Sequence, residues 1–333
     1  MKILLTGATG FLGYRTLETL LENPKITKIV ATGRNLTPER TLTHPKLSYK
    51  LGDLTQAEFV IKLVQGIDCI VNTAALSAPW GKTKDFYEAN VLTQKNLIAA
   101  AQRYGVKRFV YISTPSIYCN GNSRILVKED APLPKKFVNQ YAATKRIAEI
   151  FLALSGIEHI ILRPRAIVGR GDSVIMPRLI KAHETRKLRI IGDGKNMVDL
   201  TAVQNVVDAI VLSIFAPQKA LNQTYNITNG TPVNLWNCIG DILQRLEMPL
   251  NTKKVPHWLA SWIASLLELK AKATDHKEPK LTQYSVDTLA HSFTLDISKA
   301  QKLLDYAPKT SIEEAINEFV TWYKTHNAPK TNP

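Results

Sequence analysis

Tyr141 and Lys145 are the side chains whose types and spacing best suit acid–base chemistry in this sequence. They stand four residues apart at the start of a predicted helix, so both lie on one face of it. A phenol with a pKa of about 10 exchanges protons poorly at neutral pH, and a nearby ammonium group favours the phenolate. The pair therefore predicts a tyrosine acid/base whose pKa the lysine moves toward the working pH.

A hydroxyl group that holds the reacting oxygen would complete this chemistry, and the sequence offers two candidates. The run from Val110 to Pro115 has the pattern of a buried strand that ends in Ser113 and Thr114. Either hydroxyl can donate a hydrogen bond to a substrate oxygen. The residues alone leave the choice between the two open.

A glycine-rich loop separates the first predicted strand from the first predicted helix. Gly7, Gly10 and Gly13 follow the pattern Gly-x-x-Gly-x-x-Gly. Glycines at such a junction permit a tight turn and let the backbone approach a pyrophosphate, whose charge the helix N-terminus favours. The spacing differs from the usual Gly-x-Gly-x-x-Gly, and no Gly-Lys-Ser/Thr of a Walker loop follows. The loop indicates dinucleotide binding, with a plain tight connection as the alternative.

The end of the second predicted strand bears on which dinucleotide binds. An acidic residue there accepts hydrogen bonds from the adenosine ribose and repels a 2′-phosphate, whereas an arginine does the opposite. Arg34 occupies this position, after Gly33. We therefore expect NADP as the preferred cofactor, with NAD as the alternative.

These motifs, in this order, resemble those of the extended short-chain dehydrogenases/reductases, within the superfamily of NAD-dependent epimerases and dehydratases. The resemblance covers essentially the whole chain, and its motifs are the glycine loop at 6–13, Asp53-Leu54, Asn72-x-Ala74-Ala75, Asn90, the hydroxyl strand and the Tyr141/Lys145 pair. Four stretches are similar to the 3β-hydroxysteroid dehydrogenase-like branch: residues 112–116, 141–145, 162–165 and 192–196.

The resemblance implies a role for each matching residue. Tyr141 would be the acid/base, Lys145 would hold the nicotinamide ribose and tune Tyr141, and Thr114 would orient the substrate oxygen, with Ser113 as the alternative. The cofactor would contact a larger set of residues: Gly7, Thr9, Gly10, Phe11, Leu12, Arg34, Asp53, Leu54, Thr73, Ala74, Ala75, Asn90, Ser113, Tyr141, Lys145 and Pro164. Dimers that form through the helices flanking the sheet are common in the family. The resemblance therefore implies a homodimer, which the sequence itself leaves open.

The order of the predicted elements brings these side chains to one edge of a sheet. Strands are expected over 2–6, 28–32, 47–51, 68–73, 108–113 and 158–163, and helices over 11–21, 56–64, 85–103 and 139–154. This alternation predicts an α/β fold with a doubly wound parallel sheet of the Rossmann type. We assign residues 1–164 to a cofactor-binding domain, to which residues 196–216 return, and 165–333 mainly to a smaller, interleaved substrate domain.

The second part of the chain points to a lipophilic substrate. Residues 256–269 predict an apolar helix with Trp258 and Trp262 on one face. Such a helix could pack on its own domain, cover an apolar substrate or contact a membrane surface. Arg165 could bind a substrate carboxylate, and Trp80 could line the pocket.

Composition and charge argue against several other classes of function. The 333 residues carry 43 Lys and Arg against 28 Asp and Glu, a net charge of +15, but no nucleic-acid-binding motif accompanies it. No apolar run approaches the roughly 20 residues of a membrane span.

His183, His257 and His291 lack a carboxylate or cysteine partner at ligand spacing, so we expect no metal. With three cysteines and no targeting segment, we expect a cytoplasmic protein.

Three functions fit these features. The leading one is an NAD(P)-dependent oxidoreductase that interconverts a 3-keto and a 3-hydroxy group on a lipophilic substrate, a 3-keto acid or a steroid-like molecule. The second is a nucleotide-sugar epimerase or dehydratase that recycles its nicotinamide internally. The third is a cofactor-sensing protein without catalysis, which the presence of both Tyr141 and Lys145 argues against.

Overall fold

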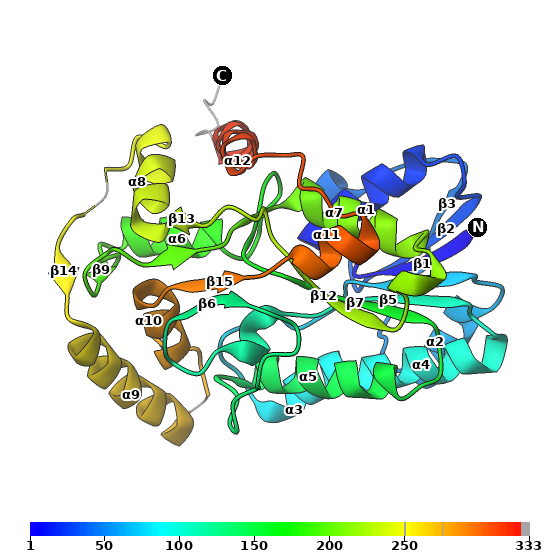
Figure 1. The fold of residues 1–333 in the computed structure, drawn as a ribbon, viewed down its shortest axis with the longest axis horizontal. Coiled ribbons are helices and arrows are strands. Elements are labelled where there is room, and N and C mark those ends of the chain that lie inside the picture. The colour runs from blue at the N-terminus through cyan, green and yellow to red at the C-terminus, as the bar shows by residue number, and fades with distance from the viewer. Residues whose placement is uncertain (250, 275, 328–333) are drawn as a thin grey trace.

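A parallel sheet of seven strands forms the centre of the molecule (Figure 1), in the order β12-β7-β5-β4-β1-β2-β3. The computed structural model describes residues 1–249, 251–274 and 276–327. The strands are β1 (Lys2–Thr6), β2 (Lys28–Thr32), β3 (Leu47–Tyr49), β4 (Cys69–Asn72), β5 (Arg108–Ile112), β7 (His159–Pro164) and β12 (Gln223–Ile227). Every neighbouring pair is parallel. The order reverses between β1 and β4, which opens a crevice at their carboxyl ends.

Helices cover both faces of this sheet, which confirms the predicted doubly wound fold (Figure 1). One face carries α1 (Phe11–Glu22), α7 (Val203–Ile214) and α11 (Ser298–Leu304), and the other carries α2 (Ala57–Val64), α4 (Thr93–Tyr104) and α5 (Gln140–Ala153). Strand residues alternate between the two cores, as when Ile3 and Leu5 face the first and Leu4 the second. Sheets buried on both faces need such continuous apolar strands.

The helix expected over 85–103 is interrupted. The chain there forms α3 (Thr83–Phe86), a π-helical segment η2 (Tyr87–Leu92) and then α4. Asn90 lies in the π-helical segment and is buried. A π-helical turn is often found at functional sites, and this one directs the Asn90 side chain toward the loop after β4.

Later segments of the chain return to the main sheet. The expected return over 196–216 contains α7, which packs against α1, but it ends before β12. β12 joins the sheet edge, where Tyr225 pairs with Leu162 of β7. The sequence of β12, Gln-Thr-Tyr-Asn-Ile, alternates polar and apolar residues and so lacks the apolar run of the other strands. The division into two domains stays a prediction, and its last six residues, 328–333, lie outside the described residues.

The remaining elements form the second, interleaved region, on the left in Figure 1. A small mixed sheet contains β6 (Arg124–Val127), β10 (Met197–Val198), β13 (Val233–Asn234) and β15 (Phe293–Leu295). Two shorter pairs are β8 (Ile167–Val168) with β11 (Thr201–Ala202), and β9 (Ile190–Ile191) with β14 (Lys254–Val255). The helices are α6 (Met176–Glu184), α8 (Leu235–Arg245), α9 (His257–Ala273), α10 (Gln283–Ala290) and α12 (Ile312–Asn327).

Short 3₁₀ turns connect several of these elements: η1 (Pro38–Arg40), η3 (Pro115–Tyr118) and η4 (Gln218–Ala220). An ion pair between Arg15 Nη1 and Glu318 Oε1, 2.6 Å long, ties α1 to α12 across the two regions. None of the helices in the described ranges is long and apolar enough to cross a membrane.

Candidate active site

The glycine loop lies directly against the backbone of the next strand connection. Gly7 has a φ of +67°, and a Cβ there would stand 2.7 Å from Thr73 Oγ1 and 2.8 Å from the Ala74 nitrogen. A Cβ on Gly13 would lie 2.1 Å from the Gly7 carbonyl oxygen, so α1 packs on the loop without room for a side chain. Gly10 precedes α1 and gives its first turn no side-chain cap. Its first N–H groups can therefore receive a phosphate, and this tight, uncapped cradle fits the pyrophosphate of a dinucleotide.

Two arginines stand at the end of β2 and in the loop after it. Arg34 is exposed, as expected for a residue that would meet a cofactor phosphate from solvent. Arg40, which sequence analysis did not single out, donates from Nη1 to the Thr9 carbonyl at 3.2 Å and from Nη2 to the Gly171 carbonyl at 3.0 Å. The second guanidinium thus lies beside the glycine loop. Only the folding of the chain through η1 brings it there.

The loops after β3 and β4 form the other walls of the crevice. After β3, Asp53 is exposed and Leu54 is buried. After β4, Thr73 donates to the Thr6 carbonyl at 2.7 Å, and Ala75 is exposed. Asn90 holds this loop, since its Oδ1 accepts the Leu76 N–H at 2.8 Å.

Asn90 also reaches α5, because its Nδ2 donates to Thr144 Oγ1 at 3.0 Å. Its side chain thus joins the loop after β4 to the helix that carries Tyr141 and Lys145. That helix begins where Asn139 Oδ1 accepts the Ala142 N–H at 2.9 Å. A side-chain cap of this kind fixes the first turn, and Tyr141 lies in that turn.

The structure separates the two candidate hydroxyl groups. Thr114 is buried, and its side chain hydrogen-bonds with Tyr141. Ser113 is also buried, but its hydroxyl lies toward the carboxylate of Glu149. Thr114 is therefore the hydroxyl that the fold brings to the phenol. Ser77, in the loop after β4, is a second partner of Tyr141 that sequence analysis missed.

The electrostatics of Tyr141 differ from the expectation. Burial raises its pKa above the ordinary value, and hydrogen bonds with Ser77 and Thr114 lower it by less. Lys145 does not lower it, because the ammonium points elsewhere: Nζ donates to the Ile112 carbonyl at 2.5 Å and lies 4.0 Å from the centroid of the Tyr111 ring. Burial also lowers the pKa of Lys145 to about 7, against the opposing charge of Glu149.

A buried ion pair joins α5 to β7 behind these residues. Arg163 donates from Nε to Glu149 Oε1 at 2.8 Å and from Nη2 to Oε2 at 2.7 Å. The two residues are 3% and 1% exposed. Burial raises the pKa of Glu149, but the hydrogen bonds and charge of Arg163 outweigh it, so the pKa lies below its ordinary value. Arg163 also bonds the Tyr118 hydroxyl and is therefore not available to a substrate.

Arg165 is a buried cation in a different environment. β7 ends at Pro164, and Ala166 has a φ of +42°, so Arg165 does not continue the face of Arg163. It is 7% exposed, its guanidinium lies 4.8 Å from the centroid of the Phe293 ring, and its Nε has no hydrogen-bond partner. Within the described ranges, no carboxylate lies close enough to form an ion pair with it. A buried charge without an ion-pair partner is costly.

A small hollow beside Arg165 is closed on its outer side by α10. Its other lining residues include Cys119, Tyr284, Asp287, His291 and Phe293. The Tyr284 hydroxyl lies 3.1 Å from Ser116 Oγ, and Thr114 donates to Ser116 Oγ at 3.1 Å. α10 therefore reaches the candidate catalytic hydroxyl through one intermediate side chain. Ser116 and Tyr284 are far apart in sequence, and no local pattern relates them.

Trp80 stands at the end of α9, outside this hollow. Its Nε1 donates to the His276 carbonyl at 3.0 Å, and the Lys272 ammonium lies 5.7 Å from the centroid of a Trp80 ring. Its predicted place in the pocket wall stays a prediction.

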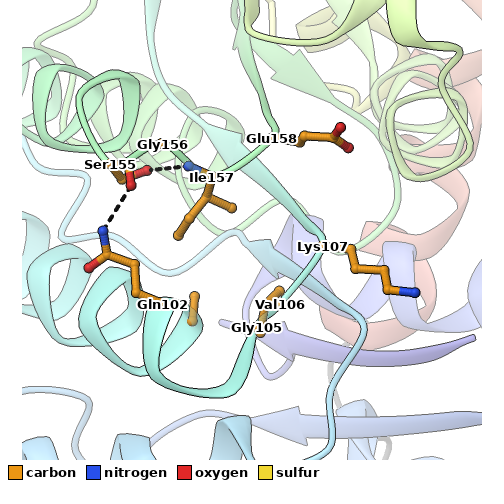
Figure 2. A pocket seen from close by; sticks show the side chains of 9 residues that line it. Gln102, Gly105, Val106, Lys107, Ser155, Gly156, Ile157 and Glu158 are labelled. Carbon is orange, nitrogen blue, oxygen red and sulfur yellow. Dashed lines mark hydrogen bonds between the residues drawn. The ribbon is translucent and has the colours of Figure 1, made fainter.

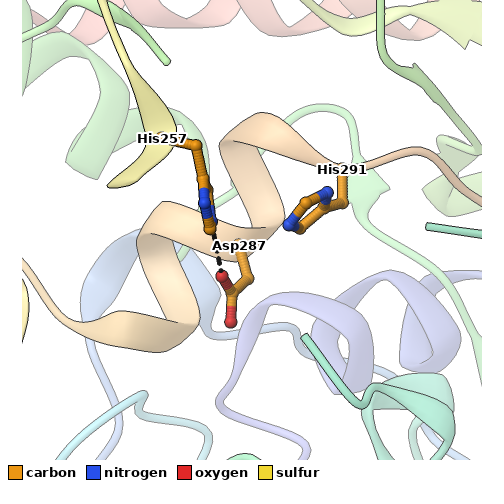
Figure 3. Close-up of side chains that lie close together, drawn as sticks. All are labelled: His257, Asp287 and His291. Atoms are coloured by element: carbon orange, nitrogen blue, oxygen red, sulfur yellow. Dashed lines mark hydrogen bonds and ion pairs between the residues drawn. The ribbon is translucent and has the colours of Figure 1, made fainter. Parts of the chain in front are cut away.

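His257, Asp287 and His291 form a cluster between α9 and α10 (Figure 3). His257 Nε2 lies 3.0 Å from Asp287 Oδ1, and the two imidazole centroids are 4.7 Å apart. The prediction that these histidines lack a carboxylate partner is therefore wrong. Asp287 precedes His291 by one helical turn, a spacing visible in the sequence, whereas His257 joins them only through the packing of α9 on α10.

A further surface hollow lies elsewhere (Figure 2). It is lined by the ends of α4 and α5 and by the residues that lead into β5 and β7, including Gln102, Lys107, Ser155 and Glu158. Gln102 Nε2 donates to the Ser155 carbonyl at 2.8 Å across it. The hollow lies at the amino ends of the strands, opposite the crevice, and contains none of the residues discussed above.

Comparison with known proteins agrees with this geometry. The model of the NAD dependent epimerase/dehydratase family matches residues 3–228. The chain belongs to this family. A 2-alkyl-3-oxoalkanoate reductase of Stenotrophomonas maltophilia is 32% identical over 95% of this chain and 97% of the relative. A 3β-hydroxysteroid-dehydrogenase/decarboxylase of Arabidopsis thaliana is 33% identical over 86% of this chain and 70% of the relative.

These relatives confirm the resemblance to the 3β-hydroxysteroid dehydrogenase-like branch. Residues 78–81 and 279–282 also resemble stretches of a bacterial 2-alkyl-3-ketoalkanoate reductase. The relative from Stenotrophomonas maltophilia is a protein of this kind. Among solved structures, a UDP-glucuronic acid 4-epimerase of Bacillus cereus in complex with NAD superposes with a TM-score of 0.76. It is 24% identical and covers 98% of this chain and 99% of its own. At that identity, the likeness shows the fold.

The burial of Lys145 predicts a pH-dependent stability. Its folded-state pKa of about 7 lies below the ordinary 10.5, so between these values the unfolded chain binds the extra proton and stability rises with pH. We expect the free energy of unfolding of the wild type, minus that of Lys145→Met, to rise by about 2 kcal/mol from pH 7 to pH 9. Urea denaturation of both proteins at the two pH values measures this difference.

Lys62→Met, at an exposed lysine of α2, is the matched control and should show no such rise. If the difference in the free energy of unfolding between the wild type and Lys145→Met also stays constant from pH 7 to pH 9, the Lys145 ammonium is solvated in the folded protein.

Proposed function

We propose that this protein is an NAD(P)-dependent oxidoreductase that interconverts a 3-keto and a 3-hydroxy group on a lipophilic carboxylic acid. The family and the two named relatives support the reaction class. The observation that carries the choice of substrate is the buried guanidinium of Arg165, whose Nε has no hydrogen-bond partner in the described part of the chain. A 3-keto acid brings the carboxylate that this cation lacks.

The glycine loop and the first turn of α1 would hold the cofactor pyrophosphate. When bound, the nicotinamide supplies or accepts a hydride at the substrate carbon. Thr114 and Tyr141 would donate hydrogen bonds to the substrate oxygen, and the phenol proton would pass to that oxygen during reduction. Because burial raises the pKa of Tyr141, the phenol is protonated at neutral pH, the form that reduction requires.

Lys145 has two roles in this proposal. Its ammonium would bind the nicotinamide ribose, as the family resemblance implies. Its pKa of about 7 leaves it ready to exchange a proton near neutral pH, so it could return a proton to Tyr141 through the ribose hydroxyl. The interaction of Glu149 with Lys145 favours the charged form.

The nucleotide-sugar alternative receives support from the fold alone. The solved epimerase shares the architecture at 24% identity, which does not extend to its substrate. The hollow beside Arg165 carries the rings of Tyr284 and Phe293, and these suit an apolar chain better than a sugar. The alternative of a cofactor-sensing protein without catalysis does not explain why the fold brings Thr114 to the phenol of Tyr141.

Some predictions concern the protein's surroundings. On α5, Ile147, Ile150, Phe151 and Leu154 are exposed, and we propose this face for the homodimer that the family implies. The cytoplasmic location, the absence of a nucleic-acid partner and the absence of a metal stay predictions.

Arg165→Met tests the substrate class. We expect the KM for a medium-chain 3-keto acid to rise about 10- to 100-fold, because a charge-assisted hydrogen-bond pair of about 1.5–3 kcal/mol is lost. The methyl ester of the same acid has no carboxylate, so its kcat/KM should change little. NADPH consumption with both substrates measures the effect, and Arg165→Lys should restore part of the affinity. An equal loss for acid and ester would remove Arg165 from carboxylate recognition.

The two arginines beside the adenosine end of the crevice support NADP as the preferred cofactor. For Arg34→Met and for Arg40→Met we expect the Kd of NADPH to rise about tenfold or more, while the Kd of NADH stays nearly constant, since one phosphate contact is lost. Fluorescence titration measures both constants. Arg103→Met, at an exposed arginine of α4, is the control. A wild type that binds NADH as tightly as NADPH would contradict the preference.

A further inference from the structure

α9 exposes its large apolar side chains and buries its small ones. The exposed fractions are 70% for Trp258, 60% for Trp262, 38% for Ile263, 48% for Leu266 and 66% for Leu269. The buried residues of the helix are Ala260, Ala264 and Ala271. The alanine face packs on α10, so the tryptophan face points outward. The helix therefore packs on its own domain through its alanines, and its large apolar side chains take no part in that packing.

The exposed residues form one continuous stripe, because they recur every three or four positions along the helix. We call this set (Trp258, Trp262, Ile263, Leu266 and Leu269) the α9 stripe. α9 lies at an outer corner of the molecule, at the lower left of Figure 1. A continuous apolar surface of this kind usually marks a site of contact with a partner or a membrane.

The charges around the α9 stripe identify the kind of partner. Exposed lysines precede the helix, occupy its last turn and follow it: Lys253, Lys254, Lys270, Lys272, Lys277 and Lys280. The acidic residues of the same stretch are Glu268, Asp275 and Glu278, so residues 253–280 have a formal net charge of +3. Tryptophan favours the boundary between lipid and water, and lysine reaches toward anionic headgroups.

We propose that the α9 stripe binds the surface of an anionic lipid bilayer. The helix would lie in the interfacial plane, with Trp258 and Trp262 among the acyl chains and the lysines at the headgroups. A second copy of this chain fits less well. A symmetric dimer through the stripe would bring the same positive flanks together, where they would repel.

The position of α9 relates membrane binding to the delivery of substrate. This part of the proposal rests on the proposed function. α9 packs on α10, where His257 Nε2 lies 3.0 Å from Asp287 Oδ1. α10 also carries Tyr284, whose hydroxyl lies 3.1 Å from Ser116 Oγ. A bilayer on the α9 stripe would therefore be one helix away from the hollow beside Arg165, and a lipophilic acid could enter from the membrane.

Vesicle sedimentation with the full chain tests the proposal. Wild type and the double variant Trp258→Gln/Trp262→Gln are mixed with vesicles of phosphatidylcholine, with and without phosphatidylglycerol. We expect the wild type to sediment with the anionic vesicles and to be released by salt. The double variant should partition about tenfold or more weakly, because two large apolar side chains are lost from the contact. Ile125→Gln/Leu126→Gln, at exposed apolar residues of β6 outside the α9 stripe, should bind like the wild type.

The thermal stability of the double variant is the control on its folding. The thermal midpoint of the double variant should match that of the wild type, because both tryptophans are exposed. Equal binding of the wild type and the double variant, or no binding of the wild type, would overturn the proposal. A wild-type dimer that ignores vesicles and dissociates on the double substitution would assign the stripe to a second copy instead.

The activity toward a short, water-soluble 3-keto acid without vesicles separates this proposal from the proposed function. The double variant should retain it in full. If neither protein turns over any 3-keto acid but the wild type alone binds anionic vesicles, the proposed function fails and the membrane site stands.

Discussion

The placement of α5 on the central sheet is the constraint on which the candidate site depends. Tyr141, Lys145 and Glu149 stand four residues apart along this helix and so form one stripe toward β5 and β7. Glu149 accepts two hydrogen bonds from Arg163, at 2.8 and 2.7 Å, in the buried interior. Removing one partner of such a pair is strongly destabilising, so the pair fixes the register of helix against strand. The ion pair thereby holds the Tyr141 phenol at the crevice and the Lys145 ammonium below it.

Besides Arg163, the site contains two desolvated cations with different environments. Lys145 donates to the Ile112 carbonyl and faces the Tyr111 ring, and burial lowers its pKa to about 7. The Arg165 guanidinium lies 4.8 Å from the centroid of the Phe293 ring and cannot lose its proton. It lowers the pKa of Asp199, but burial dominates there and raises that pKa to about 6. The unpaired guanidinium is thus the feature that best suits an anionic substrate.

Local patterns predicted the parts of the site that neighbouring residues build. Helical spacing related Tyr141 to Lys145, and the glycine loop marked the junction of β1 and α1. Contacts between distant segments could not be predicted, as with Arg40 beside Thr9 and Tyr284 beside Ser116. The orientation of α9 was also beyond the sequence, because its alanine face and its tryptophan face are both apolar. The strand β12 was missed because it lacks the continuous apolar run of the other strands.

The most direct test of the account is the reduction of a 3-keto acid by NADPH in the presence of wild type and Tyr141→Phe. The account predicts that kcat falls by roughly 10²–10⁴-fold in the variant, because a positioned general acid is lost. The Kd of NADPH should stay unchanged, because the phenylalanine keeps the ring that packs beside Thr114. A variant that retains the wild-type kcat would contradict the role of Tyr141 and, with it, the proposed chemistry.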